Sequence, residues 1–385
     1  MDYLAGSFSA VARFNGGSNA GHTVVIGNER HTFHLVPSGA MKGKELLIGA
    51  GVALDPEVLV QELSFLPSKV RQSLMVDGRC TLVSPLDKEL DGVLEQMRGS
   101  SPIGTTRRGI GPAYAMRALR LALRASDLTG EPDTSAAASF YSKLGVDTAG
   151  LSEWVEASRK AVAGLVGDVG SRVVDIGREG GSVLFEASQG TLLDLLHGSY
   201  PYATSSHTVT SYVPAGLGIP PSEAGESLGV MKCYTTRVGS GPFPTELTGP
   251  ISEQIRTVGR EYGATTGRPR RVGWLDVVAL RYAVRLNGVK NLAVSKLDVL
   301  SAVKEFKACV AYRHQGSESG DFLRSLGRLG EVEPVYESPF TMHGADYAAG
   351  LPAQAKKLVE YIEGALGVRV SLVSHGEDRS RTIEL

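Results

Sequence analysis

Short apolar runs rich in β-branched and aromatic residues alternate along this chain with longer amphipathic stretches. This alternation is typical of an α/β fold in which helices flank a large, mainly parallel central sheet. The predicted strands are Ser9–Phe14, Thr32–Val36, Ser182–Glu186, Gly229–Tyr234, Asn291–Ser295, Phe306–Tyr312 and Arg369–Val373. Apolar residues three and four positions apart predict helices at Pro56–Leu66, Leu86–Met97, Ala113–Ala125, Leu151–Val166, Trp274–Asn287 and Pro352–Leu366.

Length and composition narrow the class of protein. A chain of 385 residues allows one large domain with insertions or two domains. Because no linker stands out, we predict a single domain over 1–385, with a helical insertion at about 125–174. A formal charge of -1 argues against non-specific binding to nucleic acid or acidic membranes. The three cysteines are far apart in the sequence, and neither a long apolar run nor a signal peptide is visible, so we expect a cytoplasmic protein.

A glycine-rich loop directly follows the first predicted strand, with the sequence NGGSNAGHT at 15–23. Its backbone N–H groups can approach an anion closely, and His22 would be held at the tip as a proton donor. The alternative is a glycine-rich turn with a surface histidine.

Two further segments carry polar side chains near predicted strand ends or helix starts. The stretch 102–114 combines hydroxyls, two arginines and three glycines before a helix, which suits a phosphate ester or is simply a solvated basic loop. Arg120 would lie on that helix, where it serves a neighbouring subunit or faces water. The turn after Phe185 brings Gln189, and the hydroxyl-rich run that follows brings Thr204; both side chains can contact a base edge or a phosphate, or belong to an ordinary polar turn.

The C-terminal half adds a basic loop and a Lys-x-Asp pair. The loop 263–271 has three arginines among small residues, so it can close over a dianion or remain solvated. Lys296 and Asp298 follow a predicted strand; an aspartate there can accept the ring and exocyclic N–H groups of guanine. The nearest imitation of a Walker A loop, at 39–44, is one residue short, and we interpret it as a basic turn.

Taken in order, these segments closely resemble adenylosuccinate synthetases. The matching motifs are NGGSNAGHT, IGTTRRGIGPAY, FEASQGTLLD, YPYATSS, YTTRVGSGPFPTEL, GATTGRPRRVGWLD and SKLDVL. The resemblance implies an adenylosuccinate synthetase fold, related to P-loop NTPases, and GTP-dependent ligation of IMP and L-aspartate. The products would be adenylosuccinate, GDP and phosphate, with Mg²⁺ as cofactor, in the first committed step from IMP to AMP.

The resemblance also assigns roles to residues. His22 matches the general acid, and the Gly21 carbonyl matches a Mg²⁺ ligand. Arg120 matches an arginine that reaches IMP from the other protomer, which implies a homodimer. The other IMP contacts would be Asn19, Ala20, Gly21, His22, Thr106, Gln189, Thr204 and Arg268. The aspartate loop would be Ala264, Thr265, Thr266, Gly267, Arg268, Pro269 and Arg270. The GTP contacts would be Gly21, His22, Thr23, Arg270, Lys296, Leu297, Asp298, Ser374, His375 and Gly376.

The chain departs from the family pattern at several points. Arg107, Pro269 and His375 replace residues that are usual there, each at a tolerant loop position. The larger departure is at the start: family members begin with a buried strand and a GDEGKGK loop that supplies the catalytic base, and Met1 aligns just after that loop. We therefore expect this sequence to be N-terminally incomplete, with the strand and loop encoded upstream and in frame. A chain without them should fold poorly and show no turnover.

Two alternatives follow from the same resemblance. One is a relative that acts on dGMP to make 2-aminoadenylosuccinate. The other is a catalytically inactive guanine-nucleotide-binding protein, because the base loop is absent from the sequence.

Overall fold

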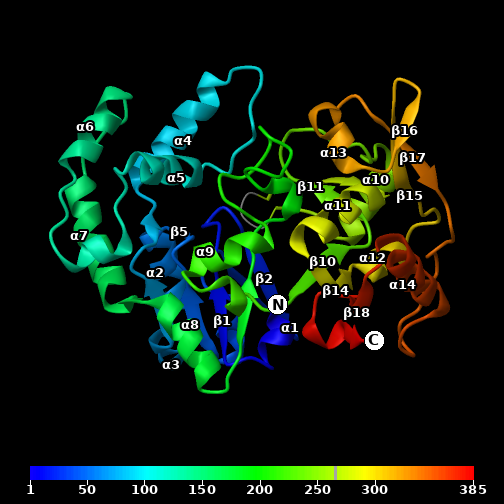
Figure 1. The fold of residues 1–385 in the computed structure, drawn as a ribbon, viewed down its shortest axis with the longest axis horizontal. Helices are drawn as coiled ribbons and strands as arrows, with labels where there is room; N and C mark the ends of the chain where they lie inside the picture. The colour runs from blue at the N-terminus through cyan, green and yellow to red at the C-terminus, as the bar shows by residue number, and fades with distance from the viewer. Residues whose placement is uncertain (264–266) are drawn as a thin grey trace. The chain divides into compact units, whose positions relative to one another are not determined.

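The computed structural model describes residues 1–263 and 267–385, which form two compact units (Figure 1). The first unit contains Met1–Val24 and Arg30–Gly225, and the second contains Val25–Glu29 and Glu226–Leu385. The short hairpin of β2 (His22–Ile26) and β3 (Glu29–Phe33) carries residues of both units.

The first unit is built on five parallel strands in the order β8-β6-β4-β1-β9. Their bounds are Val166–Gly167, Leu74–Asp77, Glu45–Ile48, Ala10–Arg13 and Val183–Glu186. Every residue of β1 is buried, because the sheet is covered on both faces. Leu46 and Ile48 of β4 join one apolar cluster and Leu47 joins another, as the alternation of side chains along a strand requires.

Helices supply both coverings of this sheet. Those of the first unit are α1 (Asp2–Ala5), α2 (Pro56–Ser64), α3 (Ser68–Gln72), α4 (Pro85–Met97), α5 (Ile110–Leu119), α6 (Ser135–Lys143), α7 (Leu151–Val162), α8 (Val169–Arg178) and α9 (Val213–Leu217). Residues of α2 and α4 pack in the cluster with Leu46, and residues of α8 and α9 pack in the cluster with Leu47. Two short strands, β5 (Ala53–Leu54) and β7 (Thr81–Leu82), pair in parallel beside the main sheet.

The predicted helix over 113–125 is wrong at its C-terminal end. Helix α5 ends at Leu119, because Arg120 adopts a left-handed conformation with φ of 65°. The chain then runs back beside β7, where the Leu82 N–H donates to the Leu123 carbonyl. Arg120 therefore caps the helix and is exposed, instead of lying on its surface.

The second unit holds parallel strands β10 (Ser227–Lys232), β14 (Val289–Ser295) and β18 (Arg369–Ser374), with antiparallel β19 (Thr382–Glu384) at one edge. A separate sheet contains β13 (Leu275–Asp276), β15 (Ala308–His314), β16 (Ser317–Ser319) and β17 (Glu333–Glu337). A third pairing joins β11 (Thr235–Arg237) to β12 (Arg271–Gly273). The helices are α10 (Pro250–Val258), α11 (Val277–Asn287), α12 (Leu297–Ser301), α13 (Phe322–Ser325) and α14 (Ala353–Leu366).

Several further boundaries differ from the predictions, and two of them have a clear cause in the hydrogen bonds. The helix predicted from Trp274 begins at Val277, because Leu275–Asp276 is a strand and the Asp276 side chain caps the helix by accepting the Ala279 N–H. The strand predicted over 32–36 ends at Phe33, because the next backbone N–H groups donate to the Glu62 carboxylate.

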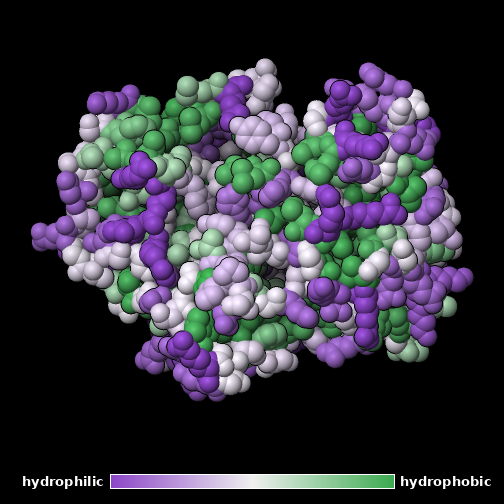
Figure 2. Space-filling model, viewed as in Figure 1, coloured by the Kyte–Doolittle hydropathy of each residue, from purple (hydrophilic) through white to green (hydrophobic). Residues whose placement is uncertain are grey.

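The predicted α/β class, with parallel sheet flanked by helices, is confirmed. Hydrophilic and hydrophobic residues are intermixed on the face shown in Figure 2. Among residues 1–263 and 267–385, no helix is both long enough and apolar enough to cross a membrane.

Candidate nucleotide site

The glycine-rich loop after β1 is held against the turn after β9. The Asn15 side chain donates to the Ser188 and His207 carbonyls, at 3.3 and 2.8 Å, and accepts the Ser188 N–H at 2.9 Å. Glycine is required at two positions. Gly16 has φ of +74°, and a Cβ on Gly17 would lie 2.6 Å from the Ala53 carbonyl oxygen. The loop therefore follows one path close to its neighbours.

A buried arginine fixes this loop, and sequence reasoning missed it. Arg13, 1% exposed at the end of β1, donates to the carbonyls of Asn15 (3.3 Å) and Gly17 (2.9 Å), and also to that of His34. Burial lowers the pKa of Arg13, and Glu186 opposes that shift. The available signal was a charge within an otherwise apolar, fully buried strand sequence, Ala-Val-Ala-Arg.

Three predicted IMP contacts meet in the first unit. Gln189 Nε2 donates to Asn19 Oδ1 at 3.1 Å, and Asn19 Nδ2 donates to Thr204 Oγ1 at 3.2 Å. Gln189 Oε1 is buried and has no hydrogen-bond partner among the described residues. Asn19 thus binds two side chains that lie 170 and 185 positions away from it in the sequence. The three side chains form one polar row in which Gln189 Oε1 is a free acceptor.

His22 begins β2 and lies beside a buried carboxylate. Its Nδ1 is 3.6 Å from Glu186 Oε1, while Glu186 Oε2 accepts the Ser38 N–H at 2.8 Å. Burial lowers the pKa of His22, and Glu186 acts in the opposite direction. His22 Nε2 is buried and lacks a partner within the described residues. The ring therefore presents Nε2 for a ligand and turns Nδ1 toward the carboxylate.

The remaining predicted residues of the first unit lie around this row. Ala20 and Gly21 are half-buried in the loop between Asn19 and β2, and Thr23 is exposed with its hydroxyl 3.1 Å from that of Thr32. Thr106 is half-buried in the segment before α5, and it takes no part in the hydrogen bonds that join Asn19, Gln189 and Thr204. The N-terminus of α5 itself lies close to Thr204, since a Cβ on Gly111 would be 3.1 Å from Ser205 Oγ.

In the second unit, the Lys-x-Asp pair follows β14 as predicted. Lys296 has φ of 68° and donates from Nζ to the Gly259 carbonyl at 2.9 Å; Leu297 then begins α12. Asp298 Oδ1 is buried without a hydrogen-bond partner among the described residues. A buried acceptor at a parallel strand end is what a bound donor would satisfy.

The predicted 374–376 segment lies next to this pair. Ser374 is the last residue of β18, and β18 pairs in parallel with β14, so both strands end at the same edge. Ser374 Oγ donates to the Gly376 carbonyl at 3.0 Å. The His375 ring stacks on Tyr347 with centroids 4.6 Å apart and planes 5° apart. Burial lowers the pKa of His375, which favours the neutral ring.

The predicted aspartate loop is described in part. Ala264, Thr265 and Thr266 lie outside the described residues. The Gly263 N–H donates to the Arg268 carbonyl at 2.8 Å, and Tyr262 forms a bridge with Pro269. Gly267 supports the turn with φ of +66°. Arg270 Nη1 donates to Glu261 Oε2 at 2.7 Å, a contact that the sequence did not predict.

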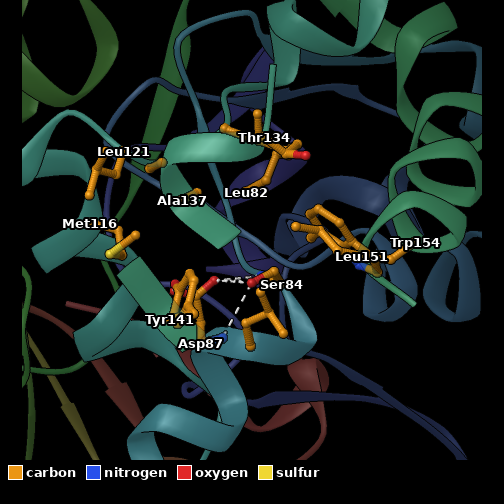
Figure 3. A pocket seen from close by; sticks show the side chains of 13 residues that line it. Leu82, Ser84, Asp87, Met116, Leu121, Thr134, Ala137, Tyr141, Leu151 and Trp154 are labelled. Carbon is orange, nitrogen blue, oxygen red and sulfur yellow. Dashed lines mark hydrogen bonds between the residues drawn. The ribbon is translucent and has the colours of Figure 1, made fainter. Parts of the chain in front are cut away.

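A separate hollow in the first unit holds none of the predicted residues (Figure 3). It is lined mainly by apolar side chains, including Leu82, Met116 and Trp154. Its polar edge is Asp87, which accepts the Ser84 hydroxyl at 2.6 Å and the Tyr141 hydroxyl at 2.5 Å. Since the same Ser84 and Asp87 side chains form the capping box of α4, we interpret the edge as structural.

Among the described residues, no three His, Cys, Asp or Glu side chains come together in a group that could hold a metal ion. The Gly21 carbonyl remains a predicted ligand. Because Mg²⁺ is often held by few protein oxygens plus substrate phosphates, this carbonyl is compatible with a nucleotide-bound ion.

Comparison with known proteins gives one consistent family. The family model "Adenylosuccinate synthetase" matches residues 1–383. The chain is 43% identical to adenylosuccinate synthetase of Moorella thermoacetica, with 100% of this chain and 94% of the relative aligned. The ligated Plasmodium falciparum adenylosuccinate synthetase superposes with a TM-score of 0.91 at 30% identity, covering 100% of this chain and 95% of that one.

A more distant solved structure shares the fold. It is a cyanophage S-2L succinoaminodeoxyadenylate synthetase bound to dGMP and dATP, with a TM-score of 0.64 and 21% identity over 99% of this chain and 89% of that one.

Proposed function

This chain belongs to the adenylosuccinate synthetase family, and we propose that it joins IMP to L-aspartate in a GTP-dependent reaction that releases GDP and phosphate. The observation that carries the proposal is the row of Asn19, Gln189 and Thr204, together with the unpartnered Nε2 of His22, which lies three residues after Asn19 in the chain. We further propose a cytoplasmic homodimer in which the exposed Arg120 reaches the partner's IMP.

In the proposed reaction, the 6-oxygen of IMP attacks the γ-phosphate of GTP after N1 loses its proton. The aspartate amine then displaces phosphate from C6, so the carbon–oxygen bond breaks and the carbon–nitrogen bond forms. Phosphorylation is needed because a purine oxygen is otherwise a poor leaving group. Residues 1–385 contain no GDEGKGK sequence, and we assign the base at N1 to none of them.

His22 would donate a hydrogen bond from Nε2 to the transferring phosphoryl group. Burial disfavours its cationic form, and Glu186 offsets part of that effect. An incoming phosphate adds further negative charge, which favours the imidazolium when the substrate is bound. The group would thus be charged where charge develops in the transition state. The Gly21 carbonyl would help to hold Mg²⁺, which when bound would supply positive charge against the phosphates.

Asp298 would bind the guanine base of GTP and give the site its specificity. A carboxylate accepts the guanine N1–H and the exocyclic N–H, and adenine cannot supply that pair of donors. The buried Oδ1 of Asp298, which has no partner in the described chain, fits this role. Lys296 and Leu297 on one side and Ser374, His375 and Gly376 on the other would complete the base pocket, and Thr23 would contact the phosphates.

The basic segment Gly267–Arg270 would bind L-aspartate. Planar guanidinium groups match carboxylates with two parallel hydrogen bonds, which suits a dicarboxylate substrate. Arg268 would also approach IMP, and Arg270 would approach GTP. This assignment uses the described residues of the loop; Ala264, Thr265 and Thr266 are proposed with them.

The test is turnover by the purified protein with IMP, aspartate and GTP, followed by chromatography of the nucleotides. Adenylosuccinate, GDP and phosphate should appear in equal amounts. His22→Asn should abolish product while IMP still binds. Asp298→Asn should exchange the preference for GTP for one for XTP, because an amide donor matches the xanthine 2-oxygen.

Three results would contradict the proposal. Product from dGMP but not from IMP would indicate the 2-aminoadenylosuccinate reaction. Guanine-nucleotide binding without turnover would indicate an inactive relative. Retained GTP preference in Asp298→Asn would remove the assignment of the base pocket.

A further inference from the structure

A completely buried carboxylate lies beneath the arginine-bearing loop. Glu261 is 0% exposed and follows α10. Its oxygens accept four hydrogen bonds: two from Lys232 Nζ at 2.8 Å, one from the Tyr234 hydroxyl at 2.5 Å, and one from Arg270 Nη1 at 2.7 Å. All of these groups belong to the second unit.

The charges of this cluster depend on one another. Burial acts to raise the pKa of Glu261, but Lys232, Tyr234 and Arg270 outweigh it and hold the pKa below its usual value. Burial lowers the pKa of Lys232 to about 8, against the attraction of Glu261. Both shifts describe a desolvated pair, and the carboxylate is ionised near neutral pH. Without it, two cations would face each other with no counter-charge.

Glu261 also contacts the loop through its backbone. Its carbonyl accepts the Arg270 N–H at 2.8 Å, and the Gly263 N–H donates to the Arg268 carbonyl at 2.8 Å. Arg256 Nε donates to the Arg270 carbonyl at 3.0 Å. Arg270 is therefore held by side chain and backbone at the same place, where the two ends of the loop meet.

We propose that Glu261 is a positioning residue that sets the direction of the Arg270 guanidinium group toward the substrate carboxylates. This inference rests on the proposed function, because that function assigns aspartate to this arginine. Glu261 acts through the loop base and does not itself touch substrate. The arrangement explains why a charge is kept fully buried next to the loop.

The first experiment separates positioning from stability by steady-state kinetics. In Glu261→Gln, the KM for aspartate should rise on the order of 10- to 100-fold, as small displacements of binding groups do. The dissociation constant for IMP, measured by calorimetry, should change less than about twofold, because the Asn19 row lies in the other unit. Glu246→Gln is the matched control: it breaks the ion pair of the neighbouring Arg271 and should leave the aspartate KM unchanged.

The second experiment does not depend on catalysis. Hydrogen exchange in the peptide spanning 256–273 should accelerate in Glu261→Gln at the Gly263 and Arg270 amides, and not in Glu246→Gln. Tyr234→Phe removes one hydrogen bond but keeps both ion pairs, so it should lower the unfolding temperature without moving the aspartate KM. It also provides a folded comparison if Glu261→Gln expresses poorly.

The outcomes separate the two proposals. Faster exchange at the loop base with a raised aspartate KM supports the inference. Faster exchange in a protein that never makes adenylosuccinate supports the positioning of the loop and contradicts the proposed function. A lowered unfolding temperature with unchanged exchange and unchanged KM would show that Glu261 is merely structural and would overturn the inference.

Discussion

Asp276 gives a quantitative prediction for the second unit. It is 4% exposed, caps α11 through the Ala279 N–H at 3.0 Å, and accepts the Tyr312 hydroxyl at 2.6 Å. Burial raises its pKa from 3.8 to about 6, and the Tyr312 hydrogen bond works against that rise. The folded state therefore binds a proton more tightly than the unfolded chain does. Stability from this group is fully present below about pH 4 and falls as pH rises through about 6.

The size of the effect follows from the two pKa values. A difference of about two units corresponds to about 3 kcal/mol between the protonated and ionised forms. Asp276→Asn keeps the shape and the cap but does not titrate. The substitution removes the acceptor of the Tyr312 hydroxyl, which lowers the free energy of unfolding by roughly 1 kcal/mol. The variant should thus be less stable than the wild type near pH 4 and more stable, by about 1–2 kcal/mol, near pH 7.5.

The assay uses the distribution of the two tryptophans. Trp154 lies in the first unit and Trp274 in the second, two residues from Asp276. In a Trp154→Phe background, urea unfolding followed by Trp274 fluorescence reports the second unit alone. The difference in unfolding free energy between Asp276→Asn and the wild-type residue should change by about 3 kcal/mol between pH 4 and pH 7.5. A difference that is independent of pH, or that changes in the opposite direction, would refute the reasoning.

Three substitutions in the first unit test the proposed IMP site and the placement of His22. Gly17→Ala places a Cβ 2.6 Å from a backbone oxygen, so we expect it to destabilise the protein by about 1–3 kcal/mol and to weaken IMP binding in calorimetry. Gly190→Ala meets nothing within 4 Å and should change stability by less than about 0.5 kcal/mol; equal effects of the two would contradict the close-packed loop. Glu186→Gln should lower kcat on the order of 10- to 100-fold with little change in IMP affinity, because it weakens the hold on His22 Nδ1; unchanged kcat would show that the carboxylate does not orient the ring.

The sequence predicted the strand-end loops better than what lies beneath them. Glycines, amides and Lys-x-Asp are visible as local patterns. Asn19 and Gln189 lie in the loops where those patterns placed them, and Asp298 lies in the first turn of α12, just after β14. Arg13 and Glu261 were missed because each is a single charge whose partners are distant in sequence or require burial to be recognised. Arg120 was placed wrongly, since the left-handed residue that ends α5 is an arginine and not the glycine that signals such an end.

The glycine-rich loop after β1 and the arginine-bearing loop 263–271 are supported in the same way. A buried charge holds the backbone in each: Arg13 donates to the Asn15 and Gly17 carbonyls in the first unit, and Glu261 pairs with Lys232 and Arg270 in the second. Unsatisfied polar atoms, His22 Nε2 in one unit and Asp298 Oδ1 in the other, are left buried. Each such atom costs about 1–3 kcal/mol when it has no partner. A ligand that supplies the missing hydrogen bond recovers that energy, so an unfavourable burial in the free protein becomes affinity for a ligand in the complex.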